Sequence, residues 1–118
     1  MNKFKKNSIM ITGASGFIGG SLMKSYRDEA QSVIGVDLKS NADDILEADL
    51  SNPEKLKEPM KHCDVIIHTA AMVSNAMSDE EMWKTNVLNT SKLIKLAIEY
   101  GIKRFVHISS IVVYGNSA

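Results

Sequence analysis

The sequence of 118 residues contains one cysteine, two prolines and no long uninterrupted hydrophobic run. A single cysteine, Cys63, cannot form an intrachain disulfide and suits a reducing compartment. No stretch approaches the roughly 20 apolar residues that cross a bilayer. The apolar stretch after the first lysines is interrupted by glycines and Thr12, so we expect no signal peptide. These absences predict a cytoplasmic protein without a membrane partner.

An excess of charge of either sign is also missing. The 14 basic and 14 acidic residues cancel, so the composition gives no general attraction to nucleic acid or to anionic membranes. The three histidines, at positions 62, 68 and 107, do not have the spacing of a metal site, and we expect no metal. No G-x-x-x-x-G-K-[ST] segment occurs, which excludes a mononucleotide P-loop.

Strand and helix patterns alternate along the whole chain. Short apolar runs predict five strands, at 8–12, 32–37, 45–48, 65–68 and 104–109. Helical periodicity predicts one helix at 17–28 and a longer one at 79–100. Because the strands are apolar on both faces, we expect a parallel sheet covered by helices on both sides. The fold class is therefore α/β, a Rossmann-like doubly wound sheet of about five strands, in a single domain over residues 1–118.

Capping signals mark the long helix. Ser78 with Glu81 has the spacing of a capping box and predicts its first turn, while Gly101 is well placed to follow its last residue. Eight residues of this helix are predicted to fall on or near one stripe: Trp83, Asn86, Val87, Thr90, Leu93, Ile94, Ala97 and Ile98.

A second capping signal precedes a short helix in the middle of the chain. Ser51 with Glu54 has the same spacing as a capping box, and Pro53 suits a first helical turn. Pro59 is predicted to stop or kink this helix after about a turn and a half.

Three evenly spaced glycines, Gly13, Gly16 and Gly19, lie between the first strand and the first helix. The first glycine permits a tight turn, the second allows a pyrophosphate to approach the backbone, and the third allows the helix to pack on the sheet. The helix start would then offer N–H groups and partial positive charge to phosphates. The plain alternative is a glycine-rich turn that only connects strand to helix.

Asp37 ends the second predicted strand, eighteen residues after Gly19. A carboxylate there can accept hydrogen bonds from both hydroxyls of an adenosine ribose and would repel a 2′-phosphate. No arginine follows it directly, which favours NAD over NADP, although Lys39 is a nearby cation that argues the other way. Alternatively, Asp37 is an ordinary residue at a strand end.

Six segments carry a resemblance to a known family: TGASGFIG, VDL, ADLSN, VIIHTAA, TNVLNT and RFVHISSIVVYG. In this order and spacing, the sequence resembles the extended short-chain dehydrogenase/reductases, which include NAD(P)-dependent epimerases, dehydratases and dehydrogenases. The resemblance covers residues from about 9 to 115. It implies an NAD-binding domain of an enzyme that acts on a sugar nucleotide or an alcohol-type substrate.

The resemblance implies a role for individual residues. It places Asp49 and Leu50 beside the adenine. The sequence departs from the family's N-V-x-G-T segment at Asn89, which stands where the family has glycine and puts close helix packing there in doubt. The residues implied to bind the cofactor are Gly13, Ser15, Gly16, Phe17, Ile18, Gly19, Asp37, Asp49, Leu50, Thr69, Ala70, Ala71 and Asn86.

Ser110 resembles the family's catalytic serine, which hydrogen-bonds the reacting oxygen of the substrate. A hydroxyl suits this role because it both donates and accepts. Capping of a strand end remains the alternative for Ser110. For Asn86 the alternative is a hydrogen bond within its own helix.

The family's catalytic Tyr-x-x-x-Lys pair is absent from these residues. Tyr26, Tyr100 and Tyr114 are not followed four residues later by lysine. We therefore expect the cofactor-binding front part of an enzyme, truncated before the C-terminal part and inactive alone. A non-catalytic dinucleotide-sensing or interaction module is the alternative.

The absent part also has a consequence for packing. Strands 65–68 and 104–109 are expected to expose apolar surface and an unpaired edge, and the chain is expected to self-associate, plausibly through helix 79–100.

Overall fold

The computed structural model describes residues 8–29, 32–70 and 76–108. Five parallel strands form one sheet in the order β3-β2-β1-β4-β5. The strands are β1 (Ser8–Thr12), β2 (Ser32–Asp37), β3 (Ile45–Glu47), β4 (Val65–His68) and β5 (Arg104–His107). The chain winds outward from β1 to β3 and then crosses to β4. The strand order therefore reverses between β1 and β4, where open α/β sheets form their ligand crevices.

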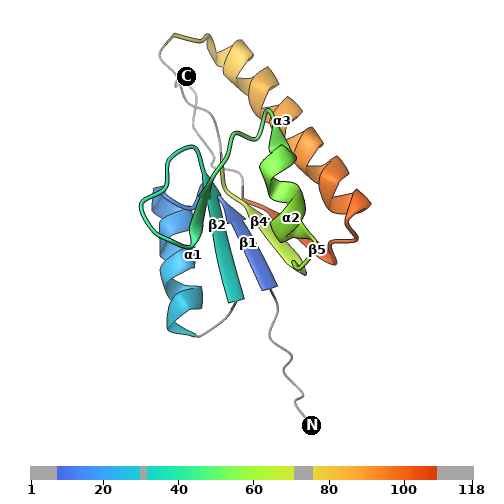
Figure 1. Cartoon of the computed structure of the whole chain (residues 1–118). Coiled ribbons are helices and arrows are strands. Elements are labelled where there is room, and N and C mark those ends of the chain that lie inside the picture. The colour runs from blue at the N-terminus through green and yellow to red at the C-terminus, as the bar shows by residue number, and fades with distance from the viewer. Residues whose placement is uncertain (1–7, 30–31, 71–75, 109–118) are drawn as a thin grey trace.

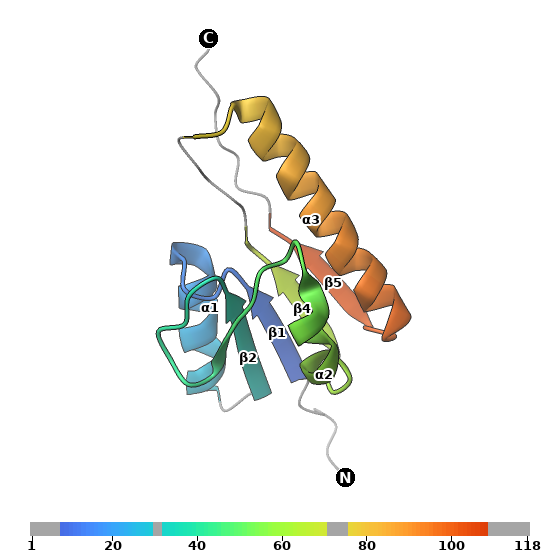
Figure 2. The ribbon, with the colours of Figure 1, turned by 45° about the horizontal axis from the view of Figure 1, so that its top comes forward.

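Helices cover both faces of this sheet (Figures 1 and 2). Helix α1 (Phe17–Asp28) packs on one face, and α2 (Lys57–Met60) and α3 (Asp79–Glu99) pack on the other. A short 3-10 turn, η1 (Pro53–Leu56), leads into α2. The doubly wound Rossmann-like fold predicted from the alternating pattern is confirmed. Helix α2 ends at Met60, one residue after Pro59.

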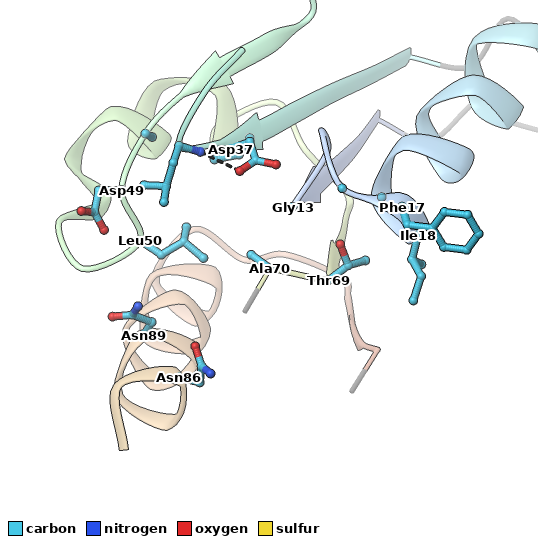
Figure 3. A pocket seen from close by; sticks show the side chains of 15 residues that line it. Gly13, Phe17, Ile18, Asp37, Asp49, Leu50, Thr69, Ala70, Asn86 and Asn89 are labelled. Atoms are coloured by element: carbon cyan, nitrogen blue, oxygen red, sulfur yellow. Dashed lines mark hydrogen bonds between the residues drawn. The ribbon is translucent and has the colours of Figure 1, made fainter. Parts of the chain in front are cut away.

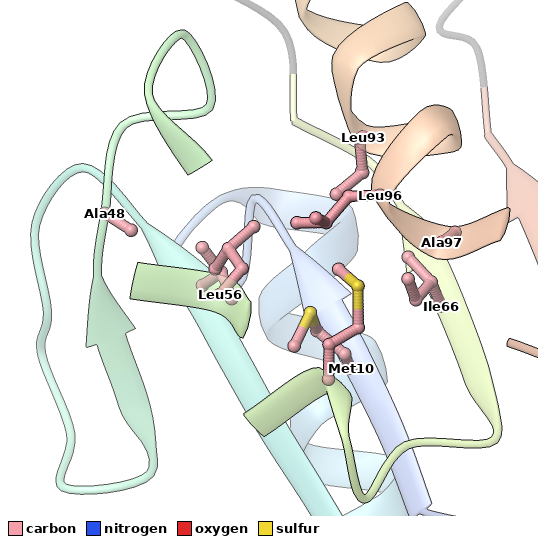
Figure 4. Close-up of a cluster of buried hydrophobic side chains, with 9 residues drawn as sticks. Met10, Ala48, Leu56, Ile66, Leu93, Leu96 and Ala97 are labelled. Atoms are coloured by element: carbon pink, nitrogen blue, oxygen red, sulfur yellow. The ribbon is translucent and has the colours of Figure 1, made fainter. Parts of the chain in front are cut away.

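Residues of β1 divide between two cores, as the two-residue period of a strand requires. Met10 points into the cluster under α2 and α3, while Ile9 and Ile11 point into the cluster under α1. Figure 4 shows the first cluster, in which Met10 faces Leu56 and the side chains of α3. Each fully buried side chain of this size contributes about 1.5–3 kcal/mol of burial free energy.

The predicted ends of α3 are confirmed. The Ser78 Oγ accepts a hydrogen bond from the backbone N–H of Glu81 at 3.1 Å, and the Ser78 N–H donates to Glu81 Oε1 at 3.0 Å. Gly101 follows the helix with a φ of 68°, the left-handed conformation typical of a helix C-terminus.

The predicted stripe of α3 is only partly correct. The side of the helix that packs on the sheet carries Asn89, Leu93, Leu96 and Ala97. Four residues of the predicted stripe are instead exposed: Trp83, Val87, Ile94 and Ile98. The helix is rotated because its contact with Met10 and Ile66 selects the 89, 93, 96, 97 positions, which share one face at helical spacing.

The capping box predicted at Ser51 and Glu54 is wrong. Asn52 is the N-cap of η1, and no side chain caps this turn. The Ser51 hydroxyl donates instead to Asp49 Oδ1 at 2.8 Å. Hydrogen bonds to a charged carboxylate are stronger than those between neutral groups, which favours this local contact between Asp49 and Ser51.

The expected exposure at one side of the sheet is found for β5 but not for β4. Within the described residues β5 pairs only with β4, and its Val106 is 37% exposed. In contrast, Ile66, Ile67 and His68 of β4 are buried, because β1 and β5 flank this strand and α3 covers it. The predicted fifth strand reaches residue 109, which lies outside the described residues.

Candidate functional site

A cavity of about 580 Å³ opens at the carboxyl ends of the strands, at the point where the strand order reverses (Figure 3). Its volume is in the usual range for small-molecule and cofactor sites. It is lined by Gly13, Gly16, Phe17, Ile18, Gly19, Val36, Asp37, Leu38, Ala48, Asp49, Leu50, Thr69, Ala70, Asn86 and Asn89.

The glycine turn is held in a conformation that excludes side chains at two of its positions. Gly13 has a φ of 70°, and a Cβ there would lie 2.6 Å from Thr69 Oγ1 and 2.8 Å from the backbone nitrogen of Ala70. A Cβ on Gly19 would overlap the carbonyl oxygen of Gly13. The first glycine therefore permits the tight turn, as predicted, while the third permits α1 to approach the backbone of the glycine turn and not, as predicted, the sheet.

The first turn of α1 is open to an anion. Its N-cap is Gly16, no side chain caps it, and its first turn contains no acidic residue. The N-terminal N–H groups of a helix have no partner within the helix and carry partial positive charge. Because Gly16 to Gly19 line the cavity, this positive end faces the cavity.

Asp37 lies at the end of β2, across from this helix start. Its carboxylate accepts hydrogen bonds from the backbone N–H of Ser15 at 2.8 Å and of Leu38 at 2.7 Å, one on each oxygen. The Ser15 hydroxyl donates to the carbonyl oxygen of Lys39 at 2.9 Å. Ser15 is not among the residues that line the cavity. Its two hydrogen bonds join the glycine turn to the end of β2 and hold the Asp37 carboxylate in place.

Asp49 lies on the next wall of the cavity. Its Oδ1 accepts from the Ser51 N–H at 2.9 Å and from the Ser51 hydroxyl at 2.8 Å. These backbone and side-chain hydrogen bonds lower the pKa of Asp49 below its usual range. The Lys92 ammonium donates to the Ser51 carbonyl oxygen at 2.8 Å and ties this wall to α3. Asp49 is thus an ionised acceptor at the rim.

His68 connects β4 to β1 and to α3. Thr12 Oγ1 accepts the N–H groups of Thr69 and Ala70 at 3.1 and 3.2 Å, so its own proton is directed to His68 Nδ1, 2.6 Å away. The other ring nitrogen, Nε2, then donates to Thr90 Oγ1 of α3 at 2.9 Å.

This arrangement requires a neutral ring. Burial, with a smaller contribution from the stacked His107, lowers the pKa of His68 to about 4. His68 is therefore a neutral structural residue that fixes β1, β4 and α3 relative to one another at the cavity.

The cavity brings together most of the residues that the sequence singled out. Ala71 and Ser110 lie outside the described residues, so their predicted roles stay predictions. The sequence reasoning missed four lining residues: Val36, Leu38, Ala48 and Asn89. The first three are chain neighbours of Asp37 and Asp49, and Asn89 follows Asn86 by one helical turn, so adjacency was the available signal.

Other chemistry finds little support in the described parts of the chain. These residues contain no group of three or more side chains placed to hold a metal ion. None of the helices in residues 8–29, 32–70 and 76–108 has the length and apolar character needed to traverse a bilayer. Burial, with Asp64 nearby, raises the pKa of the Cys63 thiol to about 11, so Cys63 is a poor nucleophile at neutral pH.

Comparison with solved structures finds this fold in proteins crystallised with NAD. A short-chain dehydrogenase/reductase superfamily protein from Agrobacterium tumefaciens, crystallised with bound NAD, matches with a TM-score of 0.79 and 28% identity over 92% of this chain and 34% of its own. MoeE5, in complex with UDP-glucuronic acid and NAD, matches with a TM-score of 0.77 and 29% identity over 94% of this chain and 39% of its own.

Sequence comparison agrees. A UDP-glucose 4-epimerase from Vibrio cholerae is 34% identical over 92% of this chain and 36% of its own length. The chain thus spans about a third of the length of the curated relatives it matches. The profile of the NAD-dependent epimerase/dehydratase family matches residues 9–118. Together with the reversed strand order and the glycine turn, this match shows that the chain belongs to the NAD-dependent epimerase/dehydratase family.

Proposed function

We propose that the chain binds NAD in this cavity and is the cofactor-binding part of an NAD-dependent epimerase, dehydratase or dehydrogenase. The observation that carries the proposal is the open first turn of α1, which faces the cavity opposite the Asp37 carboxylate. A phosphate-bearing ligand with a ribose fits this pairing of positive helix end and hydrogen-bond acceptor.

Each part of the dinucleotide is assigned to one wall. The pyrophosphate lies on Gly13 to Gly19, and the adenosine ribose donates to Asp37. The adenine lies beside Asp49 and Leu50. In support, Gly13, Asp37, Asp49 and Leu50 all line the same cavity.

The nicotinamide half is assigned to the remaining wall. It passes over Thr69, Ala70 and Ala71 toward Asn86, and Ser110 hydrogen-bonds the reacting oxygen of the substrate. The bound cofactor supplies hydride transfer. Residues such as Ala70 leave room for it because their side chains are small.

NAD is proposed over NADP because Asp37 is an anion. Both of its oxygens already accept backbone N–H groups, which hold the carboxylate where a 2′-phosphate would lie close to it. Titration calorimetry of the chain with NAD and then with NADP tests this proposal. We expect NAD to bind at least about tenfold more tightly. Equal affinities, or tighter binding of NADP, would contradict the assignment of Asp37.

We further propose that these 118 residues alone turn over no substrate, since they contain no Tyr-x-x-x-Lys pair. The substrate of the whole protein is proposed to be a sugar nucleotide or an alcohol. A steady-state rate with NAD and UDP-glucose would contradict the proposed inactivity. The second candidate is a non-catalytic dinucleotide-sensing or interaction module. A reading frame that continues to Tyr-x-x-x-Lys about two dozen residues past Ser110 would support the enzyme.

Self-association is proposed through the exposed side of α3. Trp83 is 61% exposed, and Val87, Ile94 and Ile98 continue the same exposed apolar side at helical spacing. Sedimentation velocity at micromolar concentration is expected to show a dimer or larger species, and Trp83→Glu is expected to reduce it. A clean monomer of the unmodified chain would contradict the proposal.

We also propose a cytoplasmic location, which the single cysteine favours.

A further inference from the structure

Asn89 is a largely buried polar side chain without a hydrogen-bond partner among the described residues. It lines the cavity from α3 and is only 8% exposed. Within the described residues, no hydrogen bond links its carboxamide to another group. An amide that lines a cavity without a hydrogen bond to the protein leaves its donor and its acceptor available to a ligand.

The carboxamide is reachable from the cavity. Among the described side chains, no polar atom is both fully enclosed and without a hydrogen-bond partner. Because Asn89 has no such partner, its polar atoms keep contact with open space. Asn89 lines the cavity, and Figure 3 shows its amide on the α3 side, near Leu50 and Asn86.

The surroundings of Asn89 fit a flat base with a polar edge. Val36, Ala48 and Leu50 supply apolar surface in the same part of the cavity. Asp49 adds an ionised acceptor whose Oδ1 is occupied by Ser51 and whose Oδ2 has no hydrogen bond within the described residues. The Lys92 ammonium bonds the Ser51 carbonyl oxygen, which fixes this wall against the turn of α3 that carries Asn89.

We propose that Asn89 hydrogen-bonds the edge of the adenine of the bound dinucleotide, an inference that rests on the proposed function. Its Oδ1 accepts from the 6-amino group, and its Nδ2 donates to the adjacent ring nitrogen. A carboxamide offers an acceptor and a donor side by side, which matches an adenine edge. The 6-amino group has two N–H bonds, so Asp49 Oδ2 can accept the second.

The proposed contact with adenine depends on a residue in which this chain departs from its family. The N-V-L-N-T segment has asparagine where the resembling family has glycine, and glycine has no side chain to contact a base. The asparagine therefore adds adenine recognition to a wall that otherwise offers apolar contact.

The test compares variants of the chain with two ligands. The unmodified chain, Asn89→Ala and Asn89→Gly are each titrated with NAD and with the NAD analogue that has purine in place of adenine and so lacks the 6-amino group. The exposed Asn41→Ala is the matched control. We expect Asn89→Ala to weaken NAD binding about three- to tenfold, and to weaken binding of the analogue by a clearly smaller factor.

Each outcome decides the proposal. If Asn89→Ala weakens the binding of NAD and of the analogue by the same factor, Asn89 does not contact the 6-amino group. This inference then fails, while the proposed NAD binding stands. If the unmodified chain binds no NAD, the proposed function and this inference fail together.

A spectroscopic measurement on the unmodified chain tests the same contact if the Asn89 variants do not fold. We expect the side-chain amide resonances of Asn89 to shift more with NAD than with the analogue at saturation. Equal shifts with both ligands would overturn the inference.

Discussion

The two longest helices begin in opposite ways. Helix α3 starts with a complete capping box between Ser78 and Glu81, and its first turn carries three acidic residues. Helix α1 starts at Gly16 with no side-chain cap and no acidic residue in its first turn. Both starts have the same unpaired N–H groups and the same partial positive charge. Only α3 satisfies them with its own side chains.

This difference separates a structural helix end from one available to a ligand. Hydrogen bonds with the Ser78 backbone and hydroxyl lower the pKa of Glu81, so this carboxylate stays charged beside the N–H groups of α3. The glycines at the start of α1 provide no such side-chain hydrogen bonds, so the partial positive charge of this helix end faces the cavity. The chain forgoes stability at the place where a phosphate is proposed to bind.

The strongest test of the comparison is the introduction of a side chain at the start of α1. Gly19→Ala is expected to lower the free energy of unfolding by about 3 kcal/mol, because its Cβ would overlap the Gly13 carbonyl oxygen. We expect NAD binding to fall below detection by calorimetry. Gly20→Ala is the matched control, since its Cβ meets Ala14 O at an ordinary 3.6 Å, and it should stabilise α1 by about 0.5–1 kcal/mol. Similar losses in both variants would contradict the account.

Acidification tests the residue that ties α3 to the central strands β1 and β4. His68 has a pKa of about 4 in the folded chain, below its ordinary value near 6.5, so the unfolded chain binds a proton first as pH falls. The contribution of neutral His68 to stability is complete above pH 6.5. It is lost between about pH 6.5 and 4, by up to about 3 kcal/mol.

The corresponding measurement is thermal unfolding between pH 7.5 and 4.5. His68→Leu removes this titration and is expected to flatten the dependence of Tm on pH in that range. The same slope in both proteins would show that another group is responsible.

A carboxylate at the start of α1 would make it resemble α3. Phe17 is 92% exposed, so Phe17→Glu removes little packing. The new charge is expected to raise the free energy of unfolding by about 0.5 kcal/mol through the helix dipole. It should weaken NAD binding about five- to tenfold by repelling the pyrophosphate. Phe17→Gln controls for loss of the ring. Unchanged affinity in Phe17→Glu would count against phosphate binding at this helix.

Removal of the cap of α3 should have the smallest effect. Ser78→Ala is expected to cost about 1 kcal/mol of stability and to leave NAD affinity unchanged. Chemical denaturation gives the first quantity and calorimetry the second. A loss of NAD affinity as large as that of Phe17→Glu would mean that the two helix starts do not have separate roles.

Local signals were sufficient for the elements of the fold. The bounds of β1, β2, β4 and α1 match their predicted ranges, and the cap at Ser78 is found as predicted. These features depend on strand period, glycine spacing and capping, which act over a few residues. The cavity residues near Gly13 and Asp37 were predictable because a strand–glycine turn–helix unit imposes its own geometry.

Tertiary contacts decided what the sequence reasoning missed. The rotation of α3 depends on its contact with Met10 and Ile66, which no pattern within the helix reveals. The Ser51 carbonyl oxygen accepts a hydrogen bond from Lys92 of the distant helix α3, a contact that the capping pattern does not reveal. The burial of Asn89 in the cavity has the same origin, since helical spacing alone does not say which side faces the sheet.

Backbone amide spectra of a ¹⁵N-labelled chain titrated with NAD test the central claim most directly. The account predicts large shifts for the amides of residues 13–19 and for Asp37, and unchanged amides for Ser78 to Glu81. Shifts confined to the start of α3, or absent at residues 13–19 under saturating NAD, would contradict the claim that the open start of α1 is the phosphate site.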